Sequence, residues 1–84
     1  MDKIKIINQT IEEWFAKNKD IDKVLAKDLM PDFIKNGVFE KDHRKGLPIR
    51  NVLRELDRND QLGQIPAVHP ERKAKNTNWY FVRN

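Results

Sequence analysis

The first stretch of the chain alternates apolar and polar positions with the period of an amphipathic helix. From Lys3 to about Lys19, apolar residues recur at three- and four-residue spacing, which places them on one face: Ile4, Ile7, Ile11, Trp14 and Phe15. Asp2 is suited to cap this helix because a short acidic side chain accepts hydrogen bonds from the first free backbone N–H groups. The polar run 18–20 predicts its end.

A second apolar stretch follows Asp20, which is a suitable N-cap. Helical spacing recurs at six positions: Ile21, Val24, Leu25, Leu29, Phe33 and Ile34. Pro31 either begins a new helix or kinks a longer one, so one kinked helix and two short helices both remain open. Asn36–Gly37 predicts a stop with glycine in the left-handed conformation. Val38–Phe39 then predicts a brief extended piece.

The most regular pattern belongs to a third helix that Gly46–Pro48 opens. Its apolar residues occupy the i, i+3, i+4 and i+7 positions: Ile49, Val52, Leu53 and Leu56. Asn59–Asp60 predicts its end.

After Leu62–Gly63 the period changes to two, which is typical of strands. Residues 64–68 predict a short strand with Ile65 and Ala67 on one face, where Pro66 requires an edge or irregular position. Residues 78–83 predict a better strand, in which Trp79 and Phe81 share one face. The nine residues 69–77 between them form a charged loop longer than most hairpin loops.

This order of elements resembles the winged helix-turn-helix family. The resemblance rests on the helical segment 47–56, on Leu62 and Ile65, and on the hairpin that ends in residues 79–81. It implies an α+β, mainly helical fold in a single domain spanning 1–84, with three or four helices followed by a two-stranded wing. The turn 37–47 is longer than the family's usual turn.

Composition narrows the function classes. The chain has 84 residues and no Cys, which excludes disulfides and thiolate metal sites. Apolar residues make up 38% of it, enough for one modest core but not for a deep catalytic cleft. Because residues 1–5 are broken by charges and no stretch has the length of a membrane span, we expect a cytoplasmic protein without a membrane partner.

Charge is divided unevenly between the two halves. Residues 1–42 hold eight Lys against nine Asp or Glu, a net charge of −1. Residues 43–84 hold nine Lys or Arg against four Asp or Glu, a net charge of +5, and include all six Arg. The guanidinium fork suits phosphate and guanine edges, so this half is the expected nucleic-acid surface, with chance clustering as the alternative.

Within that half, the outer face of the third helix is the first candidate. Arg50, Arg54 and Arg58 recur at i, i+4 and i+8, and Asn51 lies beside them. A helix of this kind fits the major groove, where Arg pairs with guanine and Asn with adenine. The alternative is a solvated face carrying Arg54–Asp57 and Glu55–Arg58 pairs.

Two loops supply further cations. Arg72, Lys73 and Lys75 lie in the predicted hairpin loop, and in the resembled family a wing follows the phosphate backbone or enters the minor groove. Arg44 and Lys45 precede Gly46, where free backbone N–H groups at the helix start suit a phosphate. For both loops, simple solubility is the alternative reading.

We therefore expect a DNA-binding module, a small transcriptional regulator or accessory factor, with RNA binding not separable from DNA binding by sequence. The rival is a protein-interaction domain within a larger assembly, which an exposed face of the first helix or a large apolar patch around Met30, Phe39 and Tyr80 would favour. A homodimer is compatible with either, because one small module buries little DNA.

Catalysis is not expected, and neither is a cofactor, a metal or a small-molecule substrate. His43 and His69 are the only histidines and lie far apart, which argues against a zinc site. The three glycines do not form a phosphate loop. Glu71 and Lys73, with Asp60 upstream, faintly match a nuclease motif but lack the central sheet that such a core needs.

Overall fold

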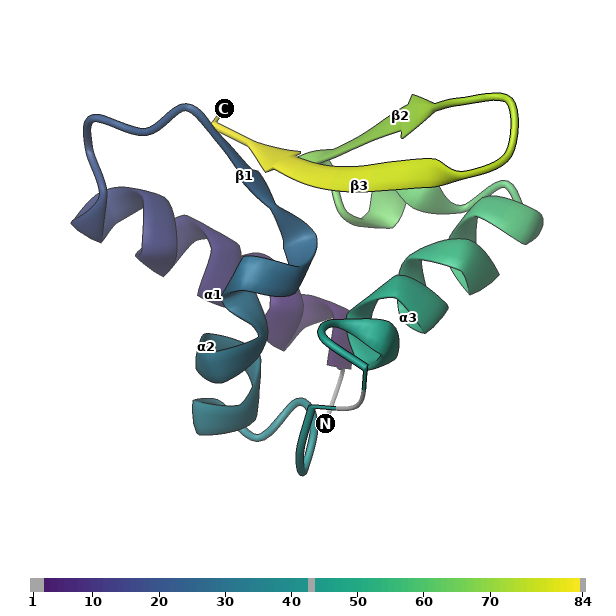
Figure 1. Ribbon diagram of the computed structural model, residues 1–84. Coiled ribbons are helices and arrows are strands. Elements are labelled where there is room, and N and C mark those ends of the chain that lie inside the picture. Colours follow the sequence, from purple (N-terminus) through teal and green to yellow (C-terminus); the bar gives the residue numbers. More distant parts are fainter. Residues whose placement is uncertain (1–2, 43, 84) are drawn as a thin grey trace.

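Three α-helices and a three-stranded antiparallel sheet form the computed structural model, which describes residues 3–42 and 44–83 (Figure 1). In chain order the elements are α1 (Lys3–Lys17), β1 (Lys23–Leu25), the 3-10 turn η1 (Ala26–Leu29), α2 (Met30–Lys35), α3 (Leu47–Arg58), the 3-10 turn η2 (Leu62–Gln64), β2 (Val68–Arg72) and β3 (Thr77–Val82). The sheet has the order β1-β3-β2. The α+β class is thus as expected, but the sheet has one strand more than the predicted hairpin.

The first helix forms as predicted, although it ends at Lys17 rather than Lys19. Ile7, Ile11 and Phe15 are buried on its inner face, while Trp14 is only partly buried at the edge of the core. Asp2, the expected N-cap, lies outside the described residues.

The prediction of a helix beginning at Ile21 is wrong. Residues 23–25 form strand β1, in which Val24 pairs with Phe81 of β3. The backbone groups of β1 are satisfied by a strand distant in sequence, and this pairing overrides the helical spacing of three apolar residues. Ile21 itself is 40% exposed, so it does not belong to the core face that the helical reading gave it.

The helical part of this segment is short. The 3-10 turn η1 leads directly into α2, and Pro31 stands in the first turn of α2, where its missing N–H costs nothing. The helix ends before Gly37, whose φ of 80° is the predicted left-handed stop. Val38 is buried and donates its N–H to the Phe33 carbonyl at 2.8 Å, and the expected extended piece 38–39 is a bend that joins no strand.

Helix α3 confirms the strongest pattern in the sequence. Ile49, Leu53 and Leu56 are buried on its inner face. Because the apolar residues take one side of α3, its arginines are left for the other sides.

The C-terminal hairpin differs from the prediction in its first strand. Of the predicted strand 64–68, only Val68 is a strand residue: η2 and a turn occupy residues 64–67, and Ile65 and Ala67 are nevertheless buried. Strand β2 begins only at Val68 and contains Pro70, which the edge position of β2 tolerates because no ladder hydrogen bond is needed from that nitrogen. The connecting loop therefore shrinks from nine residues to the ordinary hairpin length of 73–76.

The core lies between the sheet and the helices. In Figure 1 the sheet runs across the helices, with α3 beneath the β2–β3 hairpin. Trp79 and Phe81 of β3 are 4% and 0% exposed, and the rings of Phe81 and Phe33 meet edge-on at 6.1 Å. Burying each such side chain contributes roughly 1.5–3 kcal/mol. Within the described residues, no helix is both long and apolar enough to cross a membrane.

Candidate nucleic-acid interface

A polar groove of about 630 Å³ separates α3 from the turn of the β2–β3 hairpin. It brings together five of the cations singled out in the sequence: Arg50, Arg54, Arg58, Lys73 and Lys75. The three arginines come from successive turns of α3, and the two lysines come from the loop 73–76. The two predicted surfaces thus form the walls of one groove.

The groove contains one carboxylate, Asp57, and that charge is compensated. Arg72 of β2 donates from Nη1 to Oδ2 of Asp57 at 3.0 Å and from Nη2 to Oδ1 at 2.8 Å. These hydrogen bonds hold the pKa of Asp57 below its usual range and raise that of Arg72. Because Arg72 neutralises Asp57, that carboxylate does not offset the positive charge of the five groove cations.

Arg72 consequently has a different position from the one expected of it. It lies within β2 rather than in the hairpin loop, and its guanidinium fork is occupied by Asp57 of α3. This bidentate pair joins β2 of the hairpin to α3 beside the groove.

The expected pairs along α3 form only in part. Arg58 donates to Glu55 at 3.2 Å, but both side chains are largely exposed, so the pair stabilises the helix little. Asp57 pairs with Arg72 instead of Arg54. Among the described residues, Arg54, Lys73 and Lys75 have neither an ion pair nor a hydrogen-bonded side-chain partner, although the charge of Lys73 also acts on Glu71.

Arg50 is a groove cation that the backbone holds in place. It is partly buried and donates from Nη2 to the carbonyl oxygen of Arg44 at 3.2 Å. Arg44 and Lys45 have left-handed backbones with φ of 52° and 48°, and both side chains are exposed. The turn 44–46 thus presents two cations outward and holds a third by its backbone.

Gly46 explains why this turn packs closely. A Cβ atom on Gly46 would lie 2.4 Å from Cβ of Lys27, and its φ is 97°. The N–H of Gly46 donates to Asp42 Oδ1 at 2.7 Å, so it is not one of the free groups expected at this helix start.

Asn51 is exposed on α3 but does not line the groove.

Sequence reasoning missed the neutral part of the groove wall. Asn76, Thr77 and Asn78 line it beside Trp79. The last loop residue, Asn76, and the start of β3 place them opposite α3, but as isolated polar residues they carry no pattern that could have singled them out.

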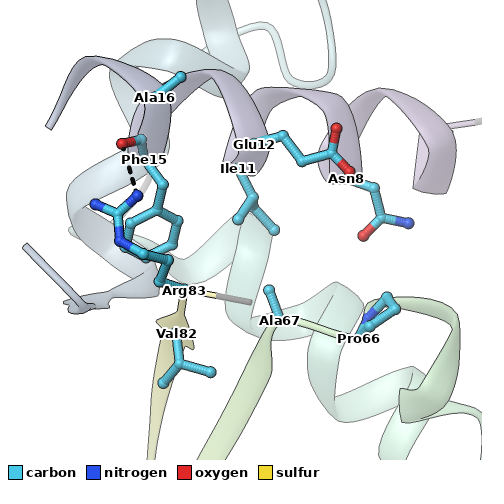
Figure 2. A pocket seen from close by; sticks show the side chains of 9 residues that line it. All are labelled: Asn8, Ile11, Glu12, Phe15, Ala16, Pro66, Ala67, Val82 and Arg83. Atoms are coloured by element: carbon cyan, nitrogen blue, oxygen red, sulfur yellow. Dashed lines mark hydrogen bonds between the residues drawn. The ribbon is translucent and has the colours of Figure 1, made fainter. Parts of the chain in front are cut away.

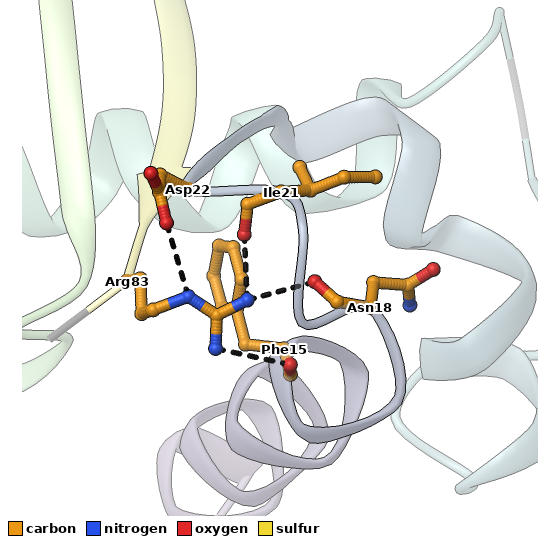
Figure 3. A network of polar contacts seen from close by, with 5 residues as sticks. All are labelled: Phe15, Asn18, Ile21, Asp22 and Arg83. Atoms are coloured by element: carbon orange, nitrogen blue, oxygen red, sulfur yellow. Dashed lines mark hydrogen bonds and ion pairs between the residues drawn. The ribbon is translucent and has the colours of Figure 1, made fainter.

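Arg83 belongs to the arginine-rich half but not to the groove (Figure 3). Its Nη1 donates to the Phe15 carbonyl at 3.1 Å, and its Nη2 donates to the carbonyls of Asn18 and Ile21, each at 2.7 Å. Its Nε donates to Asp22 Oδ1 at 3.2 Å. The side chain thereby caps the C-terminal end of α1, and its charge is used within the fold.

A second hollow, of about 380 Å³, lies between α1 and the segments 66–67 and 82–83 (Figure 2). Figure 2 shows Glu12 and Asn8 along its helical wall and Pro66 and Ala67 on the other. Asn8 is also held to the Gln64 carbonyl at 2.9 Å, which ties α1 to η2. This mixed lining offers no cluster of cations comparable to that of the groove.

No family model, curated protein or solved structure matches this chain. Its function is therefore inferred from the groove.

Of the two histidines, His43 lies outside the described residues and His69 is exposed on β2. Among residues 3–42 and 44–83, no three His, Asp or Glu side chains gather as a metal site would require.

Proposed function

We propose that this protein is a winged-helix-type module that binds double-stranded DNA in the cytoplasm, as a small regulator or accessory factor. The observation that carries the proposal is the groove in which Arg50, Arg54 and Arg58 of α3 face Lys73 and Lys75 of the hairpin turn. Phosphate contacts from Lys and Arg provide most of the affinity for DNA, and a cationic groove concentrates them.

Within this proposal the contacts divide by position. Arg54 and Asn51 are exposed on α3 and approach base edges, while Arg58, Arg44 and Lys45 contact phosphates near the two ends of the helix. Lys73 and Lys75 hold the hairpin turn to the backbone. Arg72 contributes through Asp57, by fixing the hairpin against α3.

The lack of an exposed aromatic ring in the groove supports duplex DNA rather than a single strand as the ligand. Proteins that bind single strands stack bases on exposed aromatic rings. The aromatic residue in this groove, Trp79, is 4% exposed, so its ring faces are taken up by the core. The groove therefore offers charge and hydrogen bonds to a backbone rather than a stacking platform.

The rival function is docking of a protein through an apolar patch. The residues expected to form that patch are not fully exposed. Met30 is 1% exposed, and Phe39 and Tyr80 are only partly exposed. Tyr80 is further covered by the Lys23 ammonium, 4.2 Å from its ring centre.

Binding to a fluorescent random-sequence duplex at about 50 and about 200 mM salt tests the proposal. With the five phosphate contacts assigned to Arg44, Lys45, Arg58, Lys73 and Lys75, affinity should fall about five hundred-fold over that range. Absence of binding at the lower salt concentration would overturn the proposal and return the basic groove to a protein partner or to solubility.

A further inference from the structure

A smaller hollow, of about 280 Å³, adjoins the groove where β1 and η1 meet α3 and β3. It shares Arg50, Thr77, Asn78 and Trp79 with the groove and adds Lys27 from η1. Its lining has two cations and no carboxylate. The hollow is therefore a continuation of the groove with the same sign of charge.

Two residues that line this hollow each carry a buried donor without an acceptor. Among the buried side-chain atoms that the structure describes, the nitrogens without a hydrogen-bond partner are Arg50 Nε and Trp79 Nε1. Both belong to residues that line the hollow, and Trp79 is more than nine-tenths buried. Buried donors are nearly always paired, so two unpaired ones on residues that line the same hollow point to an acceptor supplied from outside the chain.

The fold holds the cations of the hollow in place. Arg50 is anchored through Nη2 to the Arg44 carbonyl, which leaves its Nε for another acceptor. Lys27 is brought to the start of α3 because Gly46 permits its stem to approach the turn 44–46. Thr77 and Asn78 add neutral donors from β3.

We propose that this hollow binds one phosphate group, with Arg50 and the Trp79 indole N–H as direct donors and Lys27 as a charge partner. A phosphate suits the lining because its several oxygens accept from a guanidinium and from neutral N–H groups together. The proposed function supplies the source, a phosphodiester of the strand that lies in the groove. Only this choice of source rests on the proposed function; free phosphate is the other source.

Indole N–H resonances of the ¹⁵N-labelled protein test the site directly. The protein has two tryptophans, and Trp14 lies on α1 away from the hollow, so its resonance is an internal control. Titration with inorganic phosphate should shift the Trp79 resonance downfield and saturate, while Trp14 stays in place. Sodium chloride at the same ionic strength should move neither. A Trp79 resonance that stays fixed, or moves equally in chloride, overturns the site.

Matched variants separate the hollow from the groove. Arg50→Gln should abolish the Trp79 shift and lower duplex affinity about ten-fold or more. Arg54→Gln, which alters the groove but not the hollow, should keep the phosphate-induced shift. Lys27→Gln retains the stem against Gly46 and should weaken phosphate binding about two- to five-fold. Loss of the shift in Arg54→Gln as well would refute a site confined to the hollow.

A short duplex added to the same sample identifies the source. A Trp79 shift with both phosphate and duplex supports a backbone phosphate. A shift with phosphate alone, in a protein that binds duplex by fluorescence, overturns the backbone source and assigns free phosphate. A shift with phosphate in a protein that binds no duplex supports the hollow while the proposed function fails.

Discussion

Arg83 stacks its guanidinium over the Phe15 ring, 5.0 Å from the ring centre, and donates a hydrogen bond to the carbonyl oxygen of the same residue. One side chain near the end of the chain thus contacts both the ring and the backbone of a residue 68 positions earlier. Carbonyl groups in the last turn of a helix have no partner within the helix, and a cation there also opposes the helix dipole. Arg83 therefore closes α1 and joins it to the end of β3.

Replacing Arg83 with Ala should destabilise the fold by about 1.5–3 kcal/mol, because hydrogen bonds from a charged donor are lost together with the stacking on Phe15. For a domain of this size, each kcal/mol corresponds to roughly 4–8 °C in Tm. Thermal unfolding followed by circular dichroism measures the change. Arg83→Lys keeps the charge but not the planar fork, so it should recover less than half of the loss. An unchanged Tm in Arg83→Ala would refute the capping role.

Replacing each of the three glycines with Ala should change the free energy of unfolding by a different amount. Gly46→Ala combines a left-handed backbone with a Cβ that would lie 2.4 Å from Lys27 Cβ, and should cost about 2–5 kcal/mol. Gly37→Ala has φ of 80° but open space, so only the backbone cost of about 1–2 kcal/mol applies. Gly63→Ala has neither and should be neutral or stabilising by up to about 1 kcal/mol. Denaturant unfolding of the three variants gives the order, and equal costs would contradict the close approach at Gly46.

Stability should fall at acidic pH through two surface pairs. Hydrogen bonds from Arg72 lower the pKa of Asp57, and those from Lys23 lower the pKa of Glu71. A carboxyl whose pKa is lower in the folded state stabilises the fold above its unfolded pKa, about 4. This contribution is lost as the pH falls through the lower folded value.

Unfolding measured from about pH 6 to about pH 2 checks this expectation. Asp57→Asn and Glu71→Gln should each flatten the profile, and because both pairs are exposed, added salt should flatten it further. Asp20→Asn is the control, since Asp20 has no ion pair among the described residues, and it should keep the parental profile. A steep acid loss that survives in the Asp57 and Glu71 variants would point to other carboxylates.

Patterns within a short stretch of sequence predicted the elements whose hydrogen-bond partners lie within the same stretch. Helix α3 was predicted closely because four apolar positions, an initial proline and a polar end agree with one another. Strand β1 was not predicted, because Val24 pairs with Phe81 and no residue near Val24 in the sequence indicates that pairing. Pro66 was read as part of a strand, whereas Pro70 is the proline that lies in one.

The same limit applies to the arginines. Their clustering predicted the groove cations Arg50, Arg54 and Arg58, since helical spacing fixes their common side of α3. It could not separate them from Arg72 and Arg83, whose partners are Asp57 and three backbone carbonyls on other elements. An arginine held inside the fold and one free for a ligand look alike until tertiary contacts are known.

The two walls of the groove should contribute differently to DNA binding. Arg54 is exposed on α3 and has no partner among the described residues, so it is free to read a base edge. Arg54→Ala should weaken binding to a preferred site by about 1–3 kcal/mol and relax sequence preference. Lys73 lies in the hairpin turn and is assigned to a phosphate contact. Lys73→Ala should therefore weaken binding to all DNA sequences alike and reduce the slope of log affinity against log salt by about one.

Selection from a random duplex library, followed by titrations of the selected and a scrambled site, measures both effects. Lys19→Ala removes one exposed cation in the turn after α1, outside the groove, and should change neither the affinity nor the preference by more than about two-fold. If Lys19→Ala weakens binding as much as Lys73→Ala does, net charge rather than the groove governs the affinity. If Arg54→Ala and Lys73→Ala both bind as the parent does, the DNA surface lies elsewhere on the molecule.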